Sequence, residues 1–276
     1  LLLGRYKPKM SANSICVDKI LNQLSSEEYK ISCICYKDGL ESKEDNTVEY
    51  KISRGIVQSL LYKIEKKYGR VWSLLKRGLI FLSKCKEIPF LVCWPWNDPI
   101  YTAKVYKTAK KLYKKEPYDM VIAVHMPISS LIVGYKLKQK YSKVKFIPYF
   151  LDSLSGGRPI RLFSEKWNLK KKLKWERKLL KNADVIVAME SSRKHHEKYN
   201  KTEPFYDKFL YLDIPLLSIY NTKKCENPFD SSKINILFCG TANYPMRDIN
   251  YFRTLAKKLE NSNLFFTIIG QSNCSN

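Results

Sequence analysis

The sequence predicts an α/β protein in which a parallel sheet is covered by helices on both faces. Short, β-branched apolar segments alternate with segments of helical period along nearly the whole chain of 276 residues. That alternation is typical of parallel sheets with helical crossovers. The composition agrees, because 45% of the residues are hydrophobic and 13% are aromatic, which is enough for a core and excludes a disordered chain.

Each expected element in the first half of the chain follows from its own pattern. Apolar runs bounded by polar residues predict strands over residues 1–3, 31–36, 48–53, 90–93, 120–124 and 144–150. Apolar residues at helical spacing predict helices over residues 14–25, 56–84, 100–115 and 127–141. Gly69 is expected to break the second helix in two. Pro127 is expected to start the fourth, because proline fits the first turn of a helix.

The same patterns organise the second half of the chain. They predict helices over residues 164–181, 191–199 and 248–260, and strands over residues 184–188, 209–212, 234–239 and 264–269. A polar stretch that contains proline precedes the strand at 234–239 and indicates a linker. We therefore expect a first domain over residues 1–220, a linker over 221–233 and the beginning of a second domain over 234–276.

The sequence carries a net charge of +24, which bears on the kind of partner to expect. It suggests an anionic partner such as nucleic acid, anionic lipid or a phosphorylated substrate, while a general enrichment in lysine explains the charge equally well. The eight cysteines include no C-x-x-C pair, so we expect free thiols in a reducing cytosol and no zinc ribbon. With no apolar run of membrane-spanning length and no visible signal peptide, the expected location is cytoplasmic.

Several common motifs of nucleotide-binding proteins and hydrolases are missing from the sequence. It contains no G-x-G-x-x-G, no phosphate-binding P-loop and no G-x-S-x-G. Their absence disfavours NAD enzymes, P-loop NTPases and serine hydrolases of the α/β type. No D-x-D occurs either, which disfavours sugar transferases that hold a metal ion with paired carboxylates.

Polar residues that follow predicted strands are the first candidates for a site, because ligands of parallel sheets bind beyond the carboxyl ends of the strands. His125 follows the strand at 120–124, and we interpret it as a site residue. The alternative is a histidine that only caps the next helix. Asp152 follows the strand at 144–150, where it is predicted either to bind an acceptor hydroxyl or to form a turn.

A diphosphate site is predicted beyond the strand at 234–239. Gly240 and Thr241 follow that strand, and Arg247 precedes the next helix. Free amide groups at a helix start and a bidentate guanidinium both favour anionic oxygens. A plain loop with an exposed arginine is the alternative.

The predicted helix at 164–181 is strongly basic. It carries eight basic residues and one acidic residue, Glu176, between Lys166 and Lys181, with apolar residues interleaved. Such a helix either lies on an anionic membrane surface or packs on the sheet and leaves a solvated basic face. On the next helix, His195 and His196 point about 100° apart and are expected at the surface.

Four segments of the chain occur in an order that is typical of one enzyme family. The sequence P-Y-D-M-V-I-A-V-H ends at His125, and the next strand ends near Asp152. W-E-R-K-L-L-K-N-A-D-V-I-V-A-M-E-S spans residues 175–191, and I-L-F-C-G-T at 236–241 is followed by Arg247. Together with the loop after the first strand, which precedes them, the segments cover nearly the whole chain and in this order resemble glycosyltransferase family 4.

The resemblance implies the GT-B fold, in which two Rossmann-like doubly wound domains face each other across a cleft. It implies retaining transfer of a sugar from a nucleotide-sugar donor to a glycan or lipid-linked acceptor, as in cell-surface polysaccharide synthesis. No metal and no cofactor beyond the nucleotide sugar is implied. By resemblance, His125 lies beside the donor sugar, Gly240 and Arg247 contact the donor diphosphate, and Ser11 and Asn13 lie near the acceptor or the phosphates.

The chain also departs from the family pattern, and other functions stay open. Its first loop reads M-S-A-N-S without glycine, Thr241 stands where the family has arginine, and the second domain is expected to be incomplete at residue 276. A catalytically silent fragment and a basic nucleic-acid-binding protein are the alternatives. No helix-turn-helix, RRM or zinc-finger pattern is present. With a transferase, nucleic acid is not an expected partner, and the basic helix is expected on the inner face of the membrane.

Overall fold

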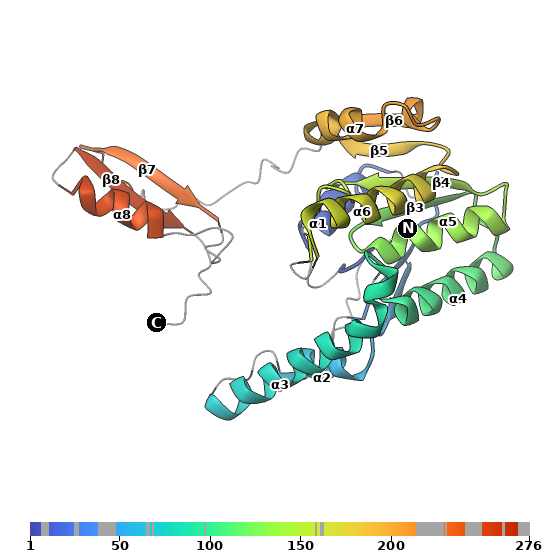
Figure 1. Cartoon of the computed structure of the whole chain (residues 1–276), viewed down its shortest axis with the longest axis horizontal. Coiled ribbons are helices and arrows are strands. Elements are labelled where there is room, and N and C mark those ends of the chain that lie inside the picture. The colour runs from blue at the N-terminus through green and yellow to red at the C-terminus, as the bar shows by residue number, and fades with distance from the viewer. Residues whose placement is uncertain are drawn as a thin grey trace. The chain divides into compact units, whose positions relative to one another are not determined.

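The computed structural model describes most of the chain in two compact units, Leu1–Ser218 (unit 1) and Ile219–Asn276 (unit 2) (Figure 1). The described residues are 1–6, 11–24, 28–37, 48–64, 67, 69–96, 98–157, 159–160, 163–213, 229, 231–240, 250–260 and 263–269. Most of the predicted linker at 221–233 lies outside them. Each unit is described by itself.

Unit 1 has the mixed α/β architecture that the sequence predicts. Its strands are β1 (Ser32–Tyr36), β2 (Val48–Ile52), β3 (Met120–His125), β4 (Lys145–Phe150), β5 (Ile186–Met189) and β6 (Phe209–Leu212). Its helices are α1 (Ala12–Leu21), α2 (Ile56–Ile64), α3 (Arg70–Glu87), α4 (Pro99–Lys115), α5 (Ile128–Lys140), α6 (Glu165–Leu180) and α7 (Arg193–Asn200). Short 3₁₀ turns cover Ile88–Cys93 (η1), Glu190–Ser192 (η2) and Tyr206–Lys208 (η3).

All described strand pairs of unit 1 are parallel, and Leu2 joins them into one sheet. The strands β3, β4, β5 and β6 are adjacent in that order, and β1 pairs with β2. Leu2 forms parallel bridges to Ile34 of β1 and to Ala123 of β3. Its amide donates to Ile122 O at 2.8 Å, and its carbonyl accepts from Val124 N at 2.8 Å.

The resulting strand order identifies where a ligand site is expected. Numbered along the chain, with the segment around Leu2 as the first strand, the sheet reads 3-2-1-4-5-6-7. Its first six positions match the doubly wound order of dinucleotide-binding folds, in which ligands bind where the order reverses. In unit 1 that switch point lies between the segment around Leu2 and β3. The fold class predicted for this unit is therefore confirmed as a Rossmann-like α/β sheet.

Helices cover the sheet on both faces, because side chains alternate along each strand. One face carries the larger apolar cluster, to which α4, α5 and α6 contribute Val105, Leu131, Leu137, Leu179 and Leu180. The other face packs against α1 through Leu3, Val17, Cys33, Cys35, Val124 and Tyr149. Cys33 and Cys35 are completely buried on this face, and they are free thiols, as the sequence predicts.

The helix α5 approaches the sheet unusually closely. It follows β3 directly and is buried along most of its length. A Cβ atom added at Gly134 would lie 2.3 Å from Cε2 of Phe146 on β4, so only glycine permits this distance between helix and strand. The close contact fixes the position of α5, and hence of its first turn beside His125.

Asp184 ties β4 to the following strand where backbone pairing is short. Pro148 has no N–H, and β4 pairs with β5 only through Tyr149 and Phe150. Before that point, the amide of Asp184 donates to Phe146 O at 2.9 Å, and its carboxylate accepts from Phe146 N at 2.7 Å. Lys138 of α5 binds the other carboxylate oxygen at 2.9 Å. The Asn-Ala-Asp sequence before β5 therefore has a structural role.

Three predicted elements differ from the structure beyond small shifts of their ends. The segment at 1–3 forms isolated bridges at Leu2 rather than a longer strand. The strand expected at 90–93 is wrong, because these residues belong to the 3₁₀ turn η1. Ile88 still has helical dihedral angles (φ −53°, ψ −48°), so the chain continues to wind after α3, and a short apolar run does not distinguish the two outcomes. The helix expected from residue 14 begins at Ala12, because Ser11 caps it and accepts from Ser14 N.

Unit 2 contains one parallel β-α-β arrangement. It consists of β7 (Ile234–Cys239), α8 (Asn250–Lys258) and β8 (Leu264–Ile269), and the two strands pair along their full length. Phe252 of α8 packs on the two strands, with its ring centroid 5.9 Å from that of Phe238 and 5.3 Å from that of Phe266. Of the helices in the described part of both units, none combines the length and apolarity needed to cross a bilayer.

Candidate functional site

The candidate site lies at the carboxyl edge of the sheet in unit 1, around the switch point. Three segments reach this edge: the loop after Leu2, the end of β3 and the end of β4. They are close together, since a Cβ atom added at Gly4 would lie 3.2 Å from the carbonyl oxygen of Met126. Residues that follow different strands therefore meet here.

His125 is the central residue of this edge. Its side chain is buried, and its Nδ1 lies 3.0 Å from the main-chain oxygen of Asp152. Because a carbonyl oxygen can only accept, the neutral ring carries its proton on Nδ1 and leaves Nε2 as an acceptor. Burial lowers the pKa of His125, although the Asp152 carbonyl opposes the shift, so the neutral ring is the form present at pH 7.

Asn13 brings the first helix to His125. Ser11 caps α1, and the main-chain amide of Ser11 in turn donates to the hydroxyl oxygen of Ser14 at 2.6 Å. These two hydrogen bonds fix the start of the helix. Asn13, in the first turn, donates from Nδ2 to the main-chain oxygen of His125 at 2.9 Å. Of the residues predicted as an acceptor or phosphate loop, Asn13 is thus in direct contact with His125. Ser11 contributes through the helix cap.

Asp152 contributes to the same edge through its backbone. Its carbonyl holds the ring of His125, while its carboxylate is exposed at a bend after β4. The structure therefore brings Asn13, His125 and Asp152 together. They follow the Leu2 segment, β3 and β4, which are neighbours in the sheet in that order. The chain bends at Asp152, and the exposed side chain is accessible to a hydroxyl group.

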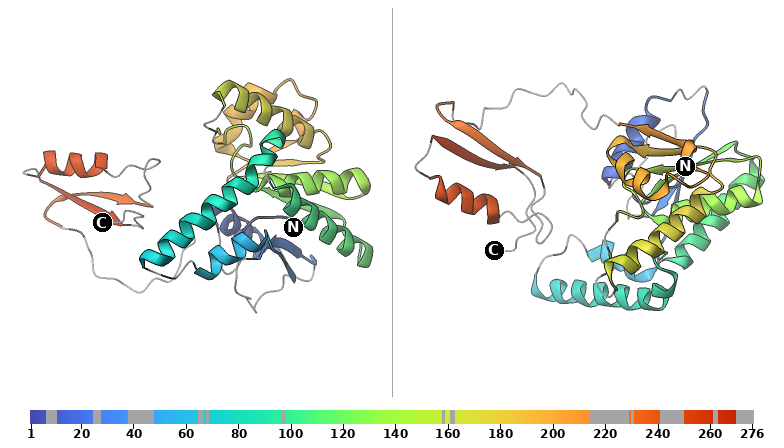
Figure 2. Two further views of the ribbon diagram at one scale, coloured as in Figure 1. Left: turned by 60° about the horizontal axis from the view of Figure 1, so that its bottom comes forward. Right: turned by 45° about the horizontal axis from the view of Figure 1, so that its top comes forward.

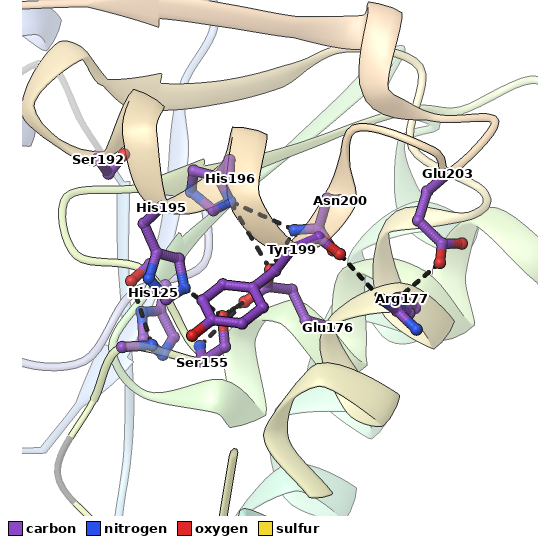
Figure 3. Close-up of polar contacts among 12 residues, drawn as sticks. His125, Ser155, Glu176, Arg177, Ser192, His195, His196, Tyr199, Asn200 and Glu203 are labelled. Atoms are coloured by element: carbon purple, nitrogen blue, oxygen red, sulfur yellow. Dashed lines mark hydrogen bonds and ion pairs between the residues drawn. The ribbon is translucent and has the colours of Figure 1, made fainter. Parts of the chain in front are cut away.

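A cluster of buried polar side chains lies beside His125 (Figure 3). Its centre is Glu176 of α6, which is completely buried. One carboxylate oxygen accepts from the amide and the hydroxyl of Ser155 at 2.9 and 2.8 Å. The other accepts from Nδ2 of Asn200 at 2.6 Å and lies 3.7 Å from Nδ1 of His196. Ser155 also lies 2.7 Å from Nε2 of His195.

The direction of the hydrogen bonds follows from the charge of Glu176. Burial raises the pKa of Glu176, but the nearby ring of His196 and the hydrogen bonds from Asn200 and Ser155 outweigh burial, so its pKa is lowered and it is a carboxylate. The hydroxyl of Ser155 then donates to Glu176 and accepts from Nε2 of His195. Burial lowers the pKa of His195, so its neutral ring leaves Nδ1 as an acceptor toward solvent.

The inner face of α6 anchors the loop that follows β4. Asn168, Lys172 and Glu176 are four residues apart and therefore share one face of the helix. Asn168 bonds the main chain of Ile160 through both its amide atoms, at 3.0 and 3.1 Å. Lys172 donates to the carbonyl of Gly157, and Glu176 holds Ser155. The loop that carries Asp152 is thus fixed to the helix at three successive points.

One prediction about this region is wrong, and one of two alternatives is decided. His196 was expected at the surface but is completely buried, because α7 packs it against the rings of Phe150 and Phe209. Of the two alternatives for the helix at 164–181, the structure shows the second, because one face packs inside unit 1 and the basic face is exposed. Lys172 lies on the packed face, where burial lowers its pKa. The exposed cations of this segment are Lys166, Lys170, Lys174, Arg177, Lys178 and Lys181.

Sequence reasoning missed the roles of Ser155, His195 and Asn200. A signal for part of the cluster is nevertheless present in the sequence. The helix buries Leu179 and Leu180, and polar residues recur at spacings of four on that same face, where an ordinary core helix has apolar residues. Such a series predicts a buried polar cluster but does not reveal the partners on α7.

In unit 2 the structure describes one of the three predicted diphosphate residues. Gly240 follows β7, has φ 148°, which favours glycine, and donates its amide to Ile269 O at 2.9 Å. Its N–H is therefore already used in the sheet. Thr241 and Arg247 lie outside the described residues.

The candidate site is a cluster of hydrogen-bond donors and acceptors. In the ranges that the structure describes, no group of three or more His, Cys, Asp or Glu side chains could hold a metal ion. The site instead offers neutral imidazole nitrogens, a carboxamide and an exposed carboxylate to a polar ligand. No protein-family model matches the chain, and no curated protein matches it significantly.

Proposed function

We propose that the protein is a retaining glycosyltransferase that transfers a sugar from a nucleotide-sugar donor to a glycan or lipid-linked acceptor. In this proposal unit 1 is the acceptor-side domain of a GT-B fold, and unit 2 begins the donor-side domain. The observation that carries the proposal is the contact between Asn13 and His125 at the switch point of the sheet. The resemblance to glycosyltransferase family 4 supports it, because the family's site histidine corresponds to His125.

The chemistry of the edge suits a substrate rich in hydroxyl groups. Neutral His125 offers Nε2 as an acceptor for a hydroxyl of the donor sugar. The exposed carboxylate of Asp152 and Nδ1 of His195 are further acceptors, which would bind and orient hydroxyl groups of the acceptor substrate. Correct orientation of the two reacting groups is a large part of the rate gain in a group transfer.

The departing diphosphate needs positive potential and hydrogen-bond donors. The helices α1 and α5 both begin at this edge, and helix starts favour anions. Thr241 and Arg247 are the other residues predicted for the diphosphate, and the amide of Gly240 is already bonded to β8. A metal ion is not part of the proposed mechanism.

The proposal is tested with the protein produced together with any sequence that follows residue 276. A panel of nucleotide sugars is screened by thermal shift, and sugar transfer or hydrolysis of the best ligand is then measured. His125→Ala should lower kcat/KM by about ten- to a hundredfold, the effect of losing one strong hydrogen bond. Gln139→Ala, at the exposed far end of α5, is the matched control and should leave kcat/KM unchanged.

Two results would contradict the proposal. Undiminished transfer by His125→Ala would remove His125 from the mechanism. If no nucleotide sugar binds, and the protein instead binds DNA or RNA with a steep salt dependence, nucleic-acid binding replaces glycosyl transfer as the function.

A further inference from the structure

A row of apolar side chains on α3 is exposed to solvent, although each of them is of a type usually found in a core. Its members are four, three or seven residues apart and form one stripe along the helix, which we call the α3 stripe: Val71, Leu74, Leu75, Phe81 and Leu82. Val71 is 75% exposed and Phe81 66%. Patches of this kind mark interaction sites more often than chance.

One side of α3, next to the α3 stripe, is packed against neighbouring elements, while Ile80 on the opposite side is 45% exposed. Trp72, Leu79 and Ser83 lie on the packed side and are partly buried. The main packing partners of α3 are α2 and the turn η1, and Lys76 donates to the main chain of Lys67 at 2.7 Å to close the α2–α3 connection. Figure 2 shows α2 and α3 projecting from the sheet of unit 1. The α3 stripe thus remains exposed to solvent when α3 packs against α2 and η1.

The charge around the α3 stripe is positive. The segment 56–88 contains eight lysine or arginine residues and two glutamates. Arg77 is exposed and four residues before Phe81, so the two side chains are neighbours at the border of the stripe. Lys63 of α2 is exposed as well. An apolar stripe with a cation at its border, in a segment of positive net charge, is the pattern of helices that lie in the interface of an anionic bilayer.

We propose that α3 docks the protein onto an anionic lipid bilayer, with the α3 stripe inserted among the acyl chains and the nearby cations at the headgroups. Arg77 lies in the middle of the helix, so the helix lies in the plane of the interface. A second copy of the chain is a poorer occupant, because two surfaces of the same positive charge repel each other. The proposal does not depend on the transferase activity, and it assigns membrane contact to α3 in place of the basic face of α6.

The test is flotation of the whole chain with vesicles of phosphatidylcholine alone or mixed equally with phosphatidylglycerol. The wild-type chain should float with the mixed vesicles and bind the neutral ones far more weakly. Phe81→Ser should weaken binding to mixed vesicles about tenfold through the lost apolar area. Arg77→Glu, which leaves the stripe intact, should weaken it about thirtyfold, as expected for a change of two charges near the surface.

Two controls separate this surface from others. Leu210→Ser removes an exposed leucine of β6, and Lys170→Glu reverses an exposed charge of α6; both should change binding less than twofold. The thermal unfolding midpoint of each variant reports whether it is folded. The proposal is overturned if the wild type binds no anionic vesicles, or if Lys170→Glu abolishes binding while Phe81→Ser does not. It is also overturned if Phe81→Ser dissociates an oligomer and leaves vesicle binding unchanged, since a second copy would then cover the stripe.

Discussion

Glu176 shows how one buried charge is made compatible with a folded core. An isolated carboxylate in an apolar environment is strongly unfavourable. Here the main-chain amide and the hydroxyl of Ser155 and the side-chain Nδ2 of Asn200 all donate to the carboxylate, and His196 lies close by. Because those donors come from a loop and from α7, the single carboxylate links three parts of unit 1. Glu176 therefore positions the Ser155 loop and α7 on α6, as well as contributing to stability.

Replacing this carboxylate should be costly. Glu176→Gln puts an amide group where one oxygen now accepts hydrogen bonds, so at least one donor loses its partner. We expect a loss of about 2–4 kcal/mol in the free energy of unfolding. Urea titration followed by tryptophan fluorescence measures it for unit 1 alone, since all five tryptophans lie in that unit.

The matched control is Glu197→Gln, on the exposed face of α7. It removes the same charge close to the same cluster and should change the free energy of unfolding by less than about 0.5 kcal/mol. Equal effects of the two variants would mean that the buried hydrogen bonds of Glu176 contribute nothing specific.

At this scale, the sequence was informative where a residue's position in a strand determines its role. His125 was identifiable because it directly follows five apolar residues of a buried strand. Ser155 and Asn200 were not, because they lie 21 and 24 residues from Glu176, and only the packing of the loop and α7 on α6 brings them to it. Sequence patterns describe one element at a time and do not contain such pairings.

At the scale of elements, α5 is the part of the fold with least room for change. Gly134→Ala should destabilise unit 1 by about 1–3 kcal/mol, because the new methyl group collides with the ring of Phe146 on β4. The measurement is again urea unfolding by tryptophan fluorescence. The side chains around His125 should also shift, since α5 begins directly after it.

A second glycine supplies the control for this prediction. Gly78 lies inside α3, and no atom lies within 4 Å of a Cβ added there. Gly78→Ala should therefore stabilise α3 by about 0.5–1 kcal/mol through helix propensity alone. If both substitutions have the same sign, the close approach of α5 to the sheet is not what requires glycine at 134.

Element boundaries were predictable where capping residues mark them. Pro127 was expected to start a helix and directly precedes α5 in the structure, while the caps Asp98 of α4 and Ser164 of α6 are seen in the structure. The 3₁₀ turn η1 was not predictable, because four apolar residues fit a buried strand and a helical turn equally well. These residues form a 3₁₀ turn because the helical winding of α3 continues into them.

For unit 1 as a whole, acid should be destabilising. The folded-state pKa values of His125 and His195 are lowered by burial, and the pKa of Glu176 is lowered by its hydrogen bonds. In each case the unfolded chain takes up the proton at a higher pH than the folded one. Stability should therefore fall as the pH drops below about 6.5, the ordinary histidine value, and again in the ordinary glutamate range.

The measurement is the thermal midpoint of unit 1 as a function of pH. His125→Gln cannot take up this proton, so its midpoint should depend less on pH in the histidine range than that of the wild type. An unchanged pH dependence in this variant would show that His125 protonates equally in both states. The net charge of +24 adds a general repulsion that grows in acid, and high salt reduces that part in both proteins.

The strand order also has a consequence for how unit 1 folds. The first residues of the chain occupy an interior position of the sheet, and Leu2 bridges Ala123, a partner 121 residues away in sequence. The chain loses the entropy of closing this long loop before the strand pair can form and stabilise it. Folding is therefore expected to be slow and limited by topology. During synthesis the N-terminal segment has no neighbour on one side until β3 has been made. The contact between Asn13 and His125 is therefore among the late events of folding, and a candidate site at the switch point forms only when most of unit 1 is already in place.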